Sequence, residues 1–139
     1  GGTAIRAADT EELTSRIAEG LASKLGEAVW FLTEGMPGVQ HAFARGCGDG
    51  SRLCNVLPVG QACSYGRGRD LTAGKDLSER KKIFSMLGHV YVVIEGGSNV
   101  SAQAKQAFDC GAIVVPIMRT GGASSGLFDF PADALKRPS

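Results

Sequence analysis

The sequence predicts an α/β protein, a single Rossmann-like domain with a mostly parallel sheet and helices on both faces. Short apolar runs alternate with helix-like segments along the 139 residues, as expected when parallel strands are joined by crossover helices. Several of these runs stop at glycines, which allow the tight turns between strands and helices. The composition agrees, because glycine is abundant, with 20 residues, while aromatic residues make up 6%. That bias favours an α/β protein over a β-sandwich.

Each predicted element has a local signal. Helices begin at capping residues such as Asp76 and carry apolar residues three or four positions apart. Strands are short apolar runs, and Trp30 lies in one of them, which places it in the expected core. Segment 60–75 is rich in glycine and charge without periodicity and is expected to be a loop. In chain order, the prediction is a helix from 9 or 10 to 25, a strand at 28–33, a helix at 39–45, a strand at 53–59, a helix from 76 or 78 to 87, a strand at 90–94, a helix at 100–110, a strand at 112–117 and a short helix at 131–135.

The chain opens with Gly1-Gly2-Thr3 directly before the first helix. A glycine pair in this place resembles a phosphate loop, which in this fold class follows a strand. We therefore expect residues 1–139 to form one domain, with a first strand that is missing ahead of Gly1.

Composition and charge argue against several classes of protein. A net charge of +1 provides no basic field, so nucleic acid is not an expected partner. No apolar run approaches the roughly 20 residues of a membrane span, so no membrane association is expected. The four cysteines show no metal-ligand spacing, and neither a metal nor a cofactor is expected. Cys54 and Cys110 lie in apolar surroundings and are expected to be buried. With no signal peptide, a reduced cytoplasmic setting is expected.

The most informative segment is 89–107, HVYVVIEGGSNVSAQAKQA. A run of β-branched residues ends at Gly96–Gly97, and a helix-like segment starts just after. The backbone can approach an anion closely there, and the N–H groups of a first helical turn have no partner within the helix. Ser98, Asn99 and Ser101 add side-chain donors, although each is also an ordinary residue at a helix start. We predict a phosphate site at this turn, against the alternative of a plain strand-to-helix connection.

A second glycine turn follows the run at 28–33. Gly35 and Gly38 frame it and would form another wall of the ligand site, while Pro37 removes one donor and suits a helix start. Arg80 is the predicted partner of the ligand's charge, because a guanidinium suits bidentate contact with phosphate or carboxylate. The alternative for Arg80 is a place on the solvated face of a helix, beside its lysine neighbours.

The order of these motifs resembles that of the LOG-type, "lysine decarboxylase-like" Rossmann proteins of the SLOG superfamily. The resemblance covers most of the chain, from Gly1 to about Ile117. Thr33–Val39 corresponds to the family's GGxxGxM-like turn, Ser78–Lys82 to its HERK-like motif, and Glu95–Gln103 to its PGGxGTxxE motif. The resemblance implies a Rossmann fold, a nucleotide or ribose-phosphate ligand, and a homo-oligomer.

The third motif is kept only in part. Glu95 replaces the family's proline, Val100 its threonine and Gln103 its final glutamate. In the family's enzymes, which cleave the N-glycosidic bond of nucleoside 5′-monophosphates, that glutamate acts with the arginine of the HERK-like motif, here Arg80. Gln103 cannot take a proton at ordinary pH, and the loss of such a group costs about 10²–10⁴-fold in rate.

Three functions stay open on these residues. The first is binding of a nucleotide or ribose-phosphate ligand without efficient turnover, with Gln103 kept as a contact residue. The second is a divergent phosphoribohydrolase, with Arg80 and Glu95 as its catalytic residues, or with Glu79 or Glu34 as the acid. The third is a carrier of a phosphorylated cofactor such as molybdopterin, which some relatives bind.

Overall fold

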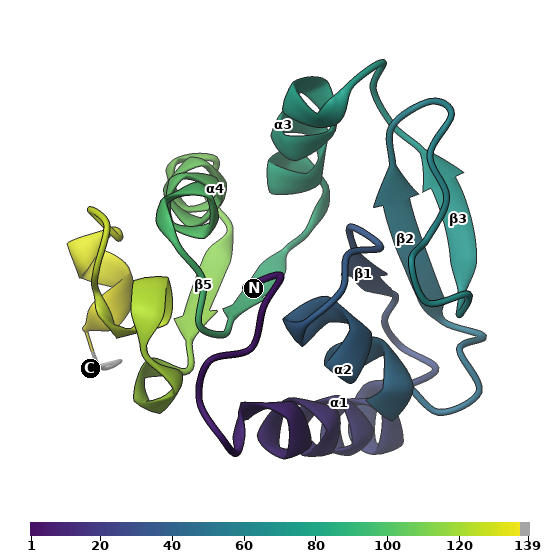
Figure 1. Ribbon diagram of the computed structural model, residues 1–139, viewed down its shortest axis with the longest axis horizontal. Helices are drawn as coiled ribbons and strands as arrows, with labels where there is room; N and C mark the ends of the chain where they lie inside the picture. Colours follow the sequence, from purple (N-terminus) through teal and green to yellow (C-terminus); the bar gives the residue numbers. More distant parts are fainter. Residues whose placement is uncertain (137–139) are drawn as a thin grey trace. The chain divides into compact units, whose positions relative to one another are not determined.

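The structure is a computed structural model, and it describes residues 1–136. The protein is an α/β protein with parallel strands, as the sequence predicts. The described residues form two compact units, each with its own parallel sheet (Figure 1). We call Thr3–Arg80 the three-strand unit, and Gly1–Gly2 with the residues from Lys81 onward the two-strand unit. The boundary between them lies within helix α3, Leu77–Leu87.

The three-strand unit is a sheet of order β1-β2-β3 with two helices packed on it. All five residues of the central strand β2 are buried, and the strand has a neighbour on each edge. The core joins α1 and α2 to the sheet around Ala18, Phe31, Ala44 and Leu53. The elements are α1 (Thr10–Leu25), β1 (Phe31–Thr33), α2 (Val39–Gly46), β2 (Leu53–Leu57) and β3 (Arg69–Thr72).

Two predictions for this unit are wrong. Trp30 is not a core residue: it is 49% exposed, and the guanidinium of Arg52 lies 5.0 Å from the ring centre. The strand begins only at Phe31. The predicted loop at 60–75 contains β3, which pairs in parallel with β2. All four residues of β3 are exposed, so the strand lacks the apolar pattern by which sequence reasoning finds strands.

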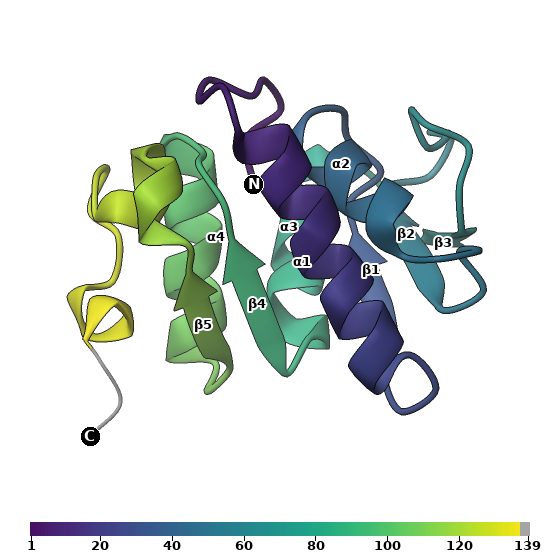
Figure 2. The ribbon, with the colours of Figure 1, turned by 90° about the horizontal axis from the view of Figure 1, so that it is seen from below.

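The two-strand unit contains β4 (Val90–Val93), α4 (Ser98–Asp109) and β5 (Ile113–Pro116). Helix α4 runs along one face of the strand pair, over a core that includes Val93, Ala107 and Val114 (Figure 2). Short 3₁₀ helices follow at Met118–Thr120, Gly122–Ser125 and Ala132–Leu135. The prediction that Cys110 is buried is wrong, because this residue lies just past the end of α4 and is exposed.

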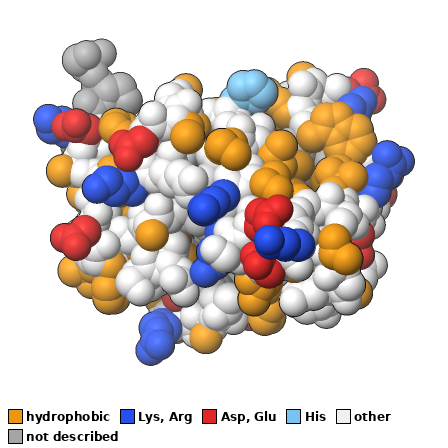
Figure 3. Space-filling model, turned by 90° about the horizontal axis from the view of Figure 1, so that it is seen from above, with side chains coloured by type: hydrophobic (Ala, Val, Ile, Leu, Met, Phe, Trp, Pro, Cys, Tyr) orange, Lys and Arg blue, Asp and Glu red, His pale blue; other side chains and the backbone are white. Residues whose placement is uncertain are grey.

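Some features concern the described residues as a set. Within residues 1–136, no helix has both the length and the apolar character to cross a membrane. Nowhere in that range do three His, Cys, Asp or Glu side chains gather as metal ligands would. On the face drawn in Figure 3, positive and negative side chains are interspersed rather than gathered by sign.

Candidate functional site

The turn between β4 and α4 has an unusual backbone. Glu95 has a φ of 50° and Gly96 a φ of 98°, and both values lie in the left-handed region. Glycine adopts such a φ without cost, whereas a residue with a side chain pays for it. Gly96 is also fixed by packing, since a Cβ there would lie 2.6 Å from the Cβ of Val100. Glu95 itself is only 3% exposed.

A second loop, after β5, supports this turn. The Oγ1 of Thr120 accepts a hydrogen bond from the backbone N–H of Glu95 at 3.0 Å. The backbone N–H of Ala123 donates to the carbonyl oxygen of Gly96 at 2.8 Å. Gly122 packs so closely that a Cβ there would lie 2.5 Å from the same oxygen. Segment 120–126 therefore braces the turn between β4 and α4.

The start of α4 is open. Its N-cap residue, Gly97, is extended (φ −108°) and provides no side-chain cap, and a Cβ there would meet nothing within 4 Å. Gly97, Ser98 and Asn99 are all exposed. The first hydrogen bond into the helix runs from the N–H of Ser101 to the carbonyl of Gly97 at 3.1 Å. Within residues 1–136, the backbone N–H groups of Ser98 and Asn99 donate to no acceptor. These donors are available to an anion.

Two polar side chains of α4 also lack partners within the described part of the chain. Ser101 is fully buried and its Oγ makes no hydrogen bond there. The Nε2 of Gln103 is buried and equally unpaired, although the rest of this side chain is half-buried. An unpaired buried polar group costs about 1–3 kcal/mol, so each of these atoms would gain from a further polar partner.

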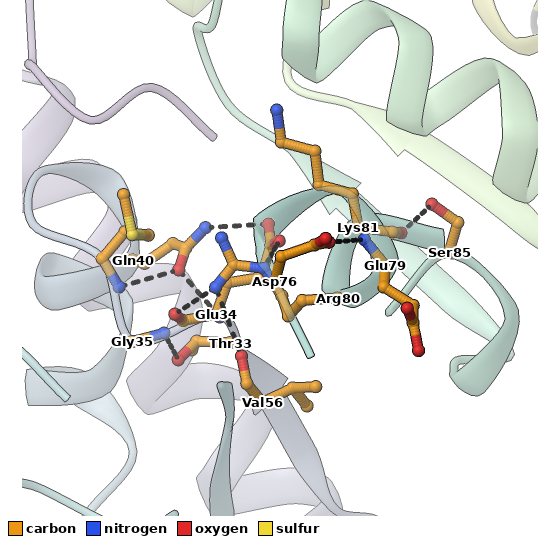
Figure 4. A network of polar contacts seen from close by, with 11 residues as sticks. Thr33, Glu34, Gly35, Gln40, Val56, Asp76, Glu79, Arg80, Lys81 and Ser85 are labelled. Atoms are coloured by element: carbon orange, nitrogen blue, oxygen red, sulfur yellow. Dashed lines mark hydrogen bonds and ion pairs between the residues drawn. The ribbon is translucent and has the colours of Figure 1, made fainter. Parts of the chain in front are cut away.

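The glycine turn after β1 differs from the β4–α4 turn, because its donors are already used. Gly35 and Gly38 have φ values of 70° and 81°. The Oε1 of Gln40 accepts hydrogen bonds from the backbone N–H groups of Glu34 at 2.8 Å and Met36 at 3.2 Å. Figure 4 shows the Gln40 amide directed at this turn. The chain itself therefore fills the place that an anion would take at these groups.

Arg80 belongs to the same network (Figure 4) and is 2% exposed. Its Nε lies 2.8 Å from the Oε2 of Glu34, in an ion pair whose two side chains are almost wholly buried. Its Nη1 donates to the backbone carbonyls of Glu34 at 3.1 Å and Val56 at 3.4 Å. The interpretation of Arg80 as a residue on a solvated helix face is wrong. Its predicted contact with a ligand stays a prediction.

A polar network in the core of the three-strand unit was missed by sequence reasoning. Asn55, in β2, is fully buried, and its Oδ1 accepts from the Thr33 hydroxyl at 2.8 Å and the Tyr65 hydroxyl at 2.6 Å. Its Nδ2 donates to the carbonyl of Arg67 at 2.6 Å. Burial raises the pKa of the Tyr65 hydroxyl, so the phenol stays protonated, and able to donate, at higher pH than a phenol in water. The signal in the sequence was an asparagine inside an apolar run, LCNVL.

The predicted site residues thus fall into two groups. Gly35, Gly38 and Arg80 lie in the three-strand unit, around the turn after β1. The others lie in the two-strand unit, on the β4–α4 turn and the first part of α4: Glu95, Gly96, Gly97, Ser98, Asn99, Ser101 and Gln103.

Comparison with known proteins supports the fold. The chain is similar in structure to TM1055, a structural genomics target whose X-ray structure is known, with a TM-score of 0.73 and 21% sequence identity. The likeness covers 84% of this chain and 68% of TM1055. No protein-family model matches the sequence, and no curated protein does. At this identity the likeness establishes the α/β, Rossmann-like fold alone.

Proposed function

We propose that the chain binds a nucleotide, or another ligand with a ribose phosphate, at the β4–α4 turn and does not turn it over efficiently. The observation that carries the proposal is the open start of α4, where the N–H groups of Ser98 and Asn99 donate to no acceptor in the described residues. The resemblance to the LOG-type proteins is a second support, because its third motif falls on the same turn.

The chemistry of the turn suits a phosphate. Hydrogen bonds from backbone N–H groups to a charged oxygen contribute about 1.5–3 kcal/mol each, and the positive end of the helix dipole adds about 0.3–1 kcal/mol. The hydroxyl of Ser98 and the amide of Asn99 are exposed beside these groups and can donate as well. A phosphate has enough acceptor oxygens for all of these donors.

Weak turnover follows from the residues on α4. Cleavage of a ribosyl bond develops positive charge on the sugar, which a carboxylate stabilises directly or by activating water. Gln103 stands where the family motif has glutamate, and an amide does neither at ordinary pH. Val100 likewise lacks the hydroxyl of the family's threonine. Binding is retained in this scheme because it depends on the backbone.

Calorimetry and base release test the proposal together. The protein is titrated with AMP, GMP, CMP and ribose 5-phosphate, and each nucleotide is also incubated with the protein and analysed for free base by chromatography. We expect saturable binding of at least one of these ligands and no release above the rate without protein. Absence of binding by all four would refute the phosphate site, and release of base would refute the claim of weak turnover.

A second candidate, a divergent phosphoribohydrolase, is favoured by Glu95. This residue is buried at a left-handed φ of 50° where glycine would be unstrained, and such strain persists mainly at sites of function. In this scheme the Glu95 carboxylate takes a proton from water and the water oxygen bonds to the ribose C1′. The bond to the base breaks as the base receives that proton, which returns Glu95 to its carboxylate form. Base release that Glu95→Gln abolishes, with nucleotide binding unchanged, would establish this alternative.

A further inference from the structure

The turn after β1 holds the parts of an anion site. The Arg80 guanidinium is a buried cation, and the N–H groups of Glu34 and Met36 converge on one oxygen atom. Backbone N–H groups of one turn that converge in this way form a concave site for anions. The turn also lies at the carboxyl end of a parallel strand, the usual place for ligands in this fold class.

Every part of that site is occupied by oxygens of the chain itself. The Glu34 carboxylate lies 2.8 Å from the Arg80 Nε, and the Gln40 Oε1 accepts both backbone N–H groups. The Gln40 Nε2 lies 3.5 Å from the other carboxylate oxygen, Oε1 of Glu34, so the two side chains form one unit (Figure 4). Together they present one oxygen to the cation, the Glu34 Oε2, and one to the N–H groups, the Gln40 Oε1, as two oxygens of an oxyanion would.

The guanidinium keeps capacity for another partner. Its Nε faces Glu34, and its Nη1 donates to the carbonyls of Glu34 and Val56. The Nε and the Glu34 Oε2 are both buried, and neither has a partner of hydrogen-bond geometry in the described range. A planar guanidinium binds a carboxylate or phosphate best through two parallel bonds, and here Glu34 engages it at Nε alone.

We propose that the turn after β1 is an anion site closed from within, in which the Glu34 carboxylate takes the place of an external carboxylate or phosphate at Arg80. The ligand class is an oxyanion with at least two coplanar oxygens. In the wild-type protein Glu34 excludes such anions, because it is covalently tethered beside the guanidinium and therefore present at a high effective concentration. Removal of the carboxylate opens the site. This inference is independent of the proposed function, which concerns the two-strand unit.

The test is anion rescue of a Glu34→Ala variant. Loss of the carboxylate leaves a buried guanidinium without a counter-ion, which destabilises the fold. We expect sodium phosphate or sodium acetate to restore the thermal midpoint in a saturable way, relative to sodium chloride at equal ionic strength. The anion concentration that gives half of the full rise in thermal midpoint should be about tenfold or more lower for the variant than for the wild type. Acetate and phosphate are run separately, because their comparison identifies the preferred oxyanion.

Two controls assign the effect to Arg80. Glu34→Ala combined with Arg80→Met removes the cation as well, and we expect no rescue. Glu11→Ala removes the partner of Arg45 in an exposed ion pair, where water already solvates the guanidinium, and again no rescue is expected. An equal rise of the thermal midpoint in all variants and in the wild type would indicate that the anions bind elsewhere, for example at the β4–α4 turn, and would overturn the inference. A failure of both anions to raise the thermal midpoint of Glu34→Ala would overturn it as well.

Two further measurements keep the inference testable if Glu34→Ala does not fold. Glu34→Gln keeps the volume and removes the charge, and it should show the same rescue. In the wild type, the NMR signal of the Arg80 Nε–H group should not shift as phosphate is added to tens of millimolar. A saturable shift of that signal in the wild type would show that the site is open, and the inference would be wrong.

Discussion

Replacement of Gly97 with alanine separates ligand contact from folding. The backbone of Gly97 is extended, with a φ of −108°, and an added Cβ would have no neighbour within 4 Å. Alanine adopts this conformation without strain, and it restricts the unfolded chain. The gain of about 0.4–1 kcal/mol from a less flexible unfolded chain is opposed by the preference for glycine over alanine at an N-cap, so the stability of the variant should stay within about 1 kcal/mol of the wild type. Nothing in the fold of the two-strand unit requires glycine at this position.

A ligand does require it. A methyl group on Gly97 would cover the exposed N-cap, where an anion must approach the N–H groups of Ser98 and Asn99. The loss of one charge-assisted hydrogen bond, worth about 1.5–3 kcal/mol, weakens binding by about 10- to 100-fold. Calorimetric titration of Gly97→Ala with the tightest ligand of the wild type measures this loss, and urea unfolding measures the stability.

Gly96→Ala is the matched control, one residue away. Its Cβ would lie 2.6 Å from the Cβ of Val100, and its φ of 98° suits glycine alone. Overpacking and a left-handed backbone together cost about 2–5 kcal/mol, so this variant should lose stability. If Gly97→Ala binds the ligand as tightly as the wild type, the anion does not lie on the start of α4, and the reasoning fails.

Three further results are expected. Thr120→Val removes the acceptor of the Glu95 N–H and should cost about 1–3 kcal/mol in urea unfolding, with weaker ligand binding because the turn loses its brace. Asn55→Leu removes the amide donor to the carbonyl of Arg67. It should lower the free energy of unfolding by a similar amount, seen as a lower urea midpoint with an unchanged dependence of that free energy on urea concentration. Burial raises the pKa of Cys47 from its ordinary value of 9.0 to about 11. The unfolded thiol therefore ionises first, stability falls as pH rises from 9.0 to about 11, and Cys47→Ala should reduce that fall in the thermal midpoint.

The fold class was predictable because it depends on patterns of apolar residues within short segments of the sequence. The alternation of apolar runs and helical periodicity identified α1, α2, α3 and α4, and also four of the five strands. The missed strand, β3, has four exposed residues, so it carries no burial pattern. Its place in the sheet comes from backbone hydrogen bonds to β2, which no side-chain pattern reports.

The candidate site was predictable only where it depends on the conformation of the backbone. The glycines of both turns could be found, since a left-handed φ demands glycine at Gly35, Gly38 and Gly96. Contacts over long separations could not. The sequence placed Arg80 in a motif, but not its ion pair with Glu34, 46 residues away. The same holds for Thr120, which supports Glu95 from 25 residues further along the chain.

The strain at Glu95 bears on the choice between binding and catalysis. A residue with a side chain at a left-handed φ costs about 1–2 kcal/mol. A glycine at position 95 would remove that cost. The support that Thr120 gives to the Glu95 N–H offsets part of the cost, and it holds the backbone where it is. A turn to which the Glu95 side chain contributed nothing would gain stability from glycine here. The side chain of Glu95 therefore contributes something that offsets the strain, either to the packing of the buried turn or to the chemistry of a ligand bound at its mouth.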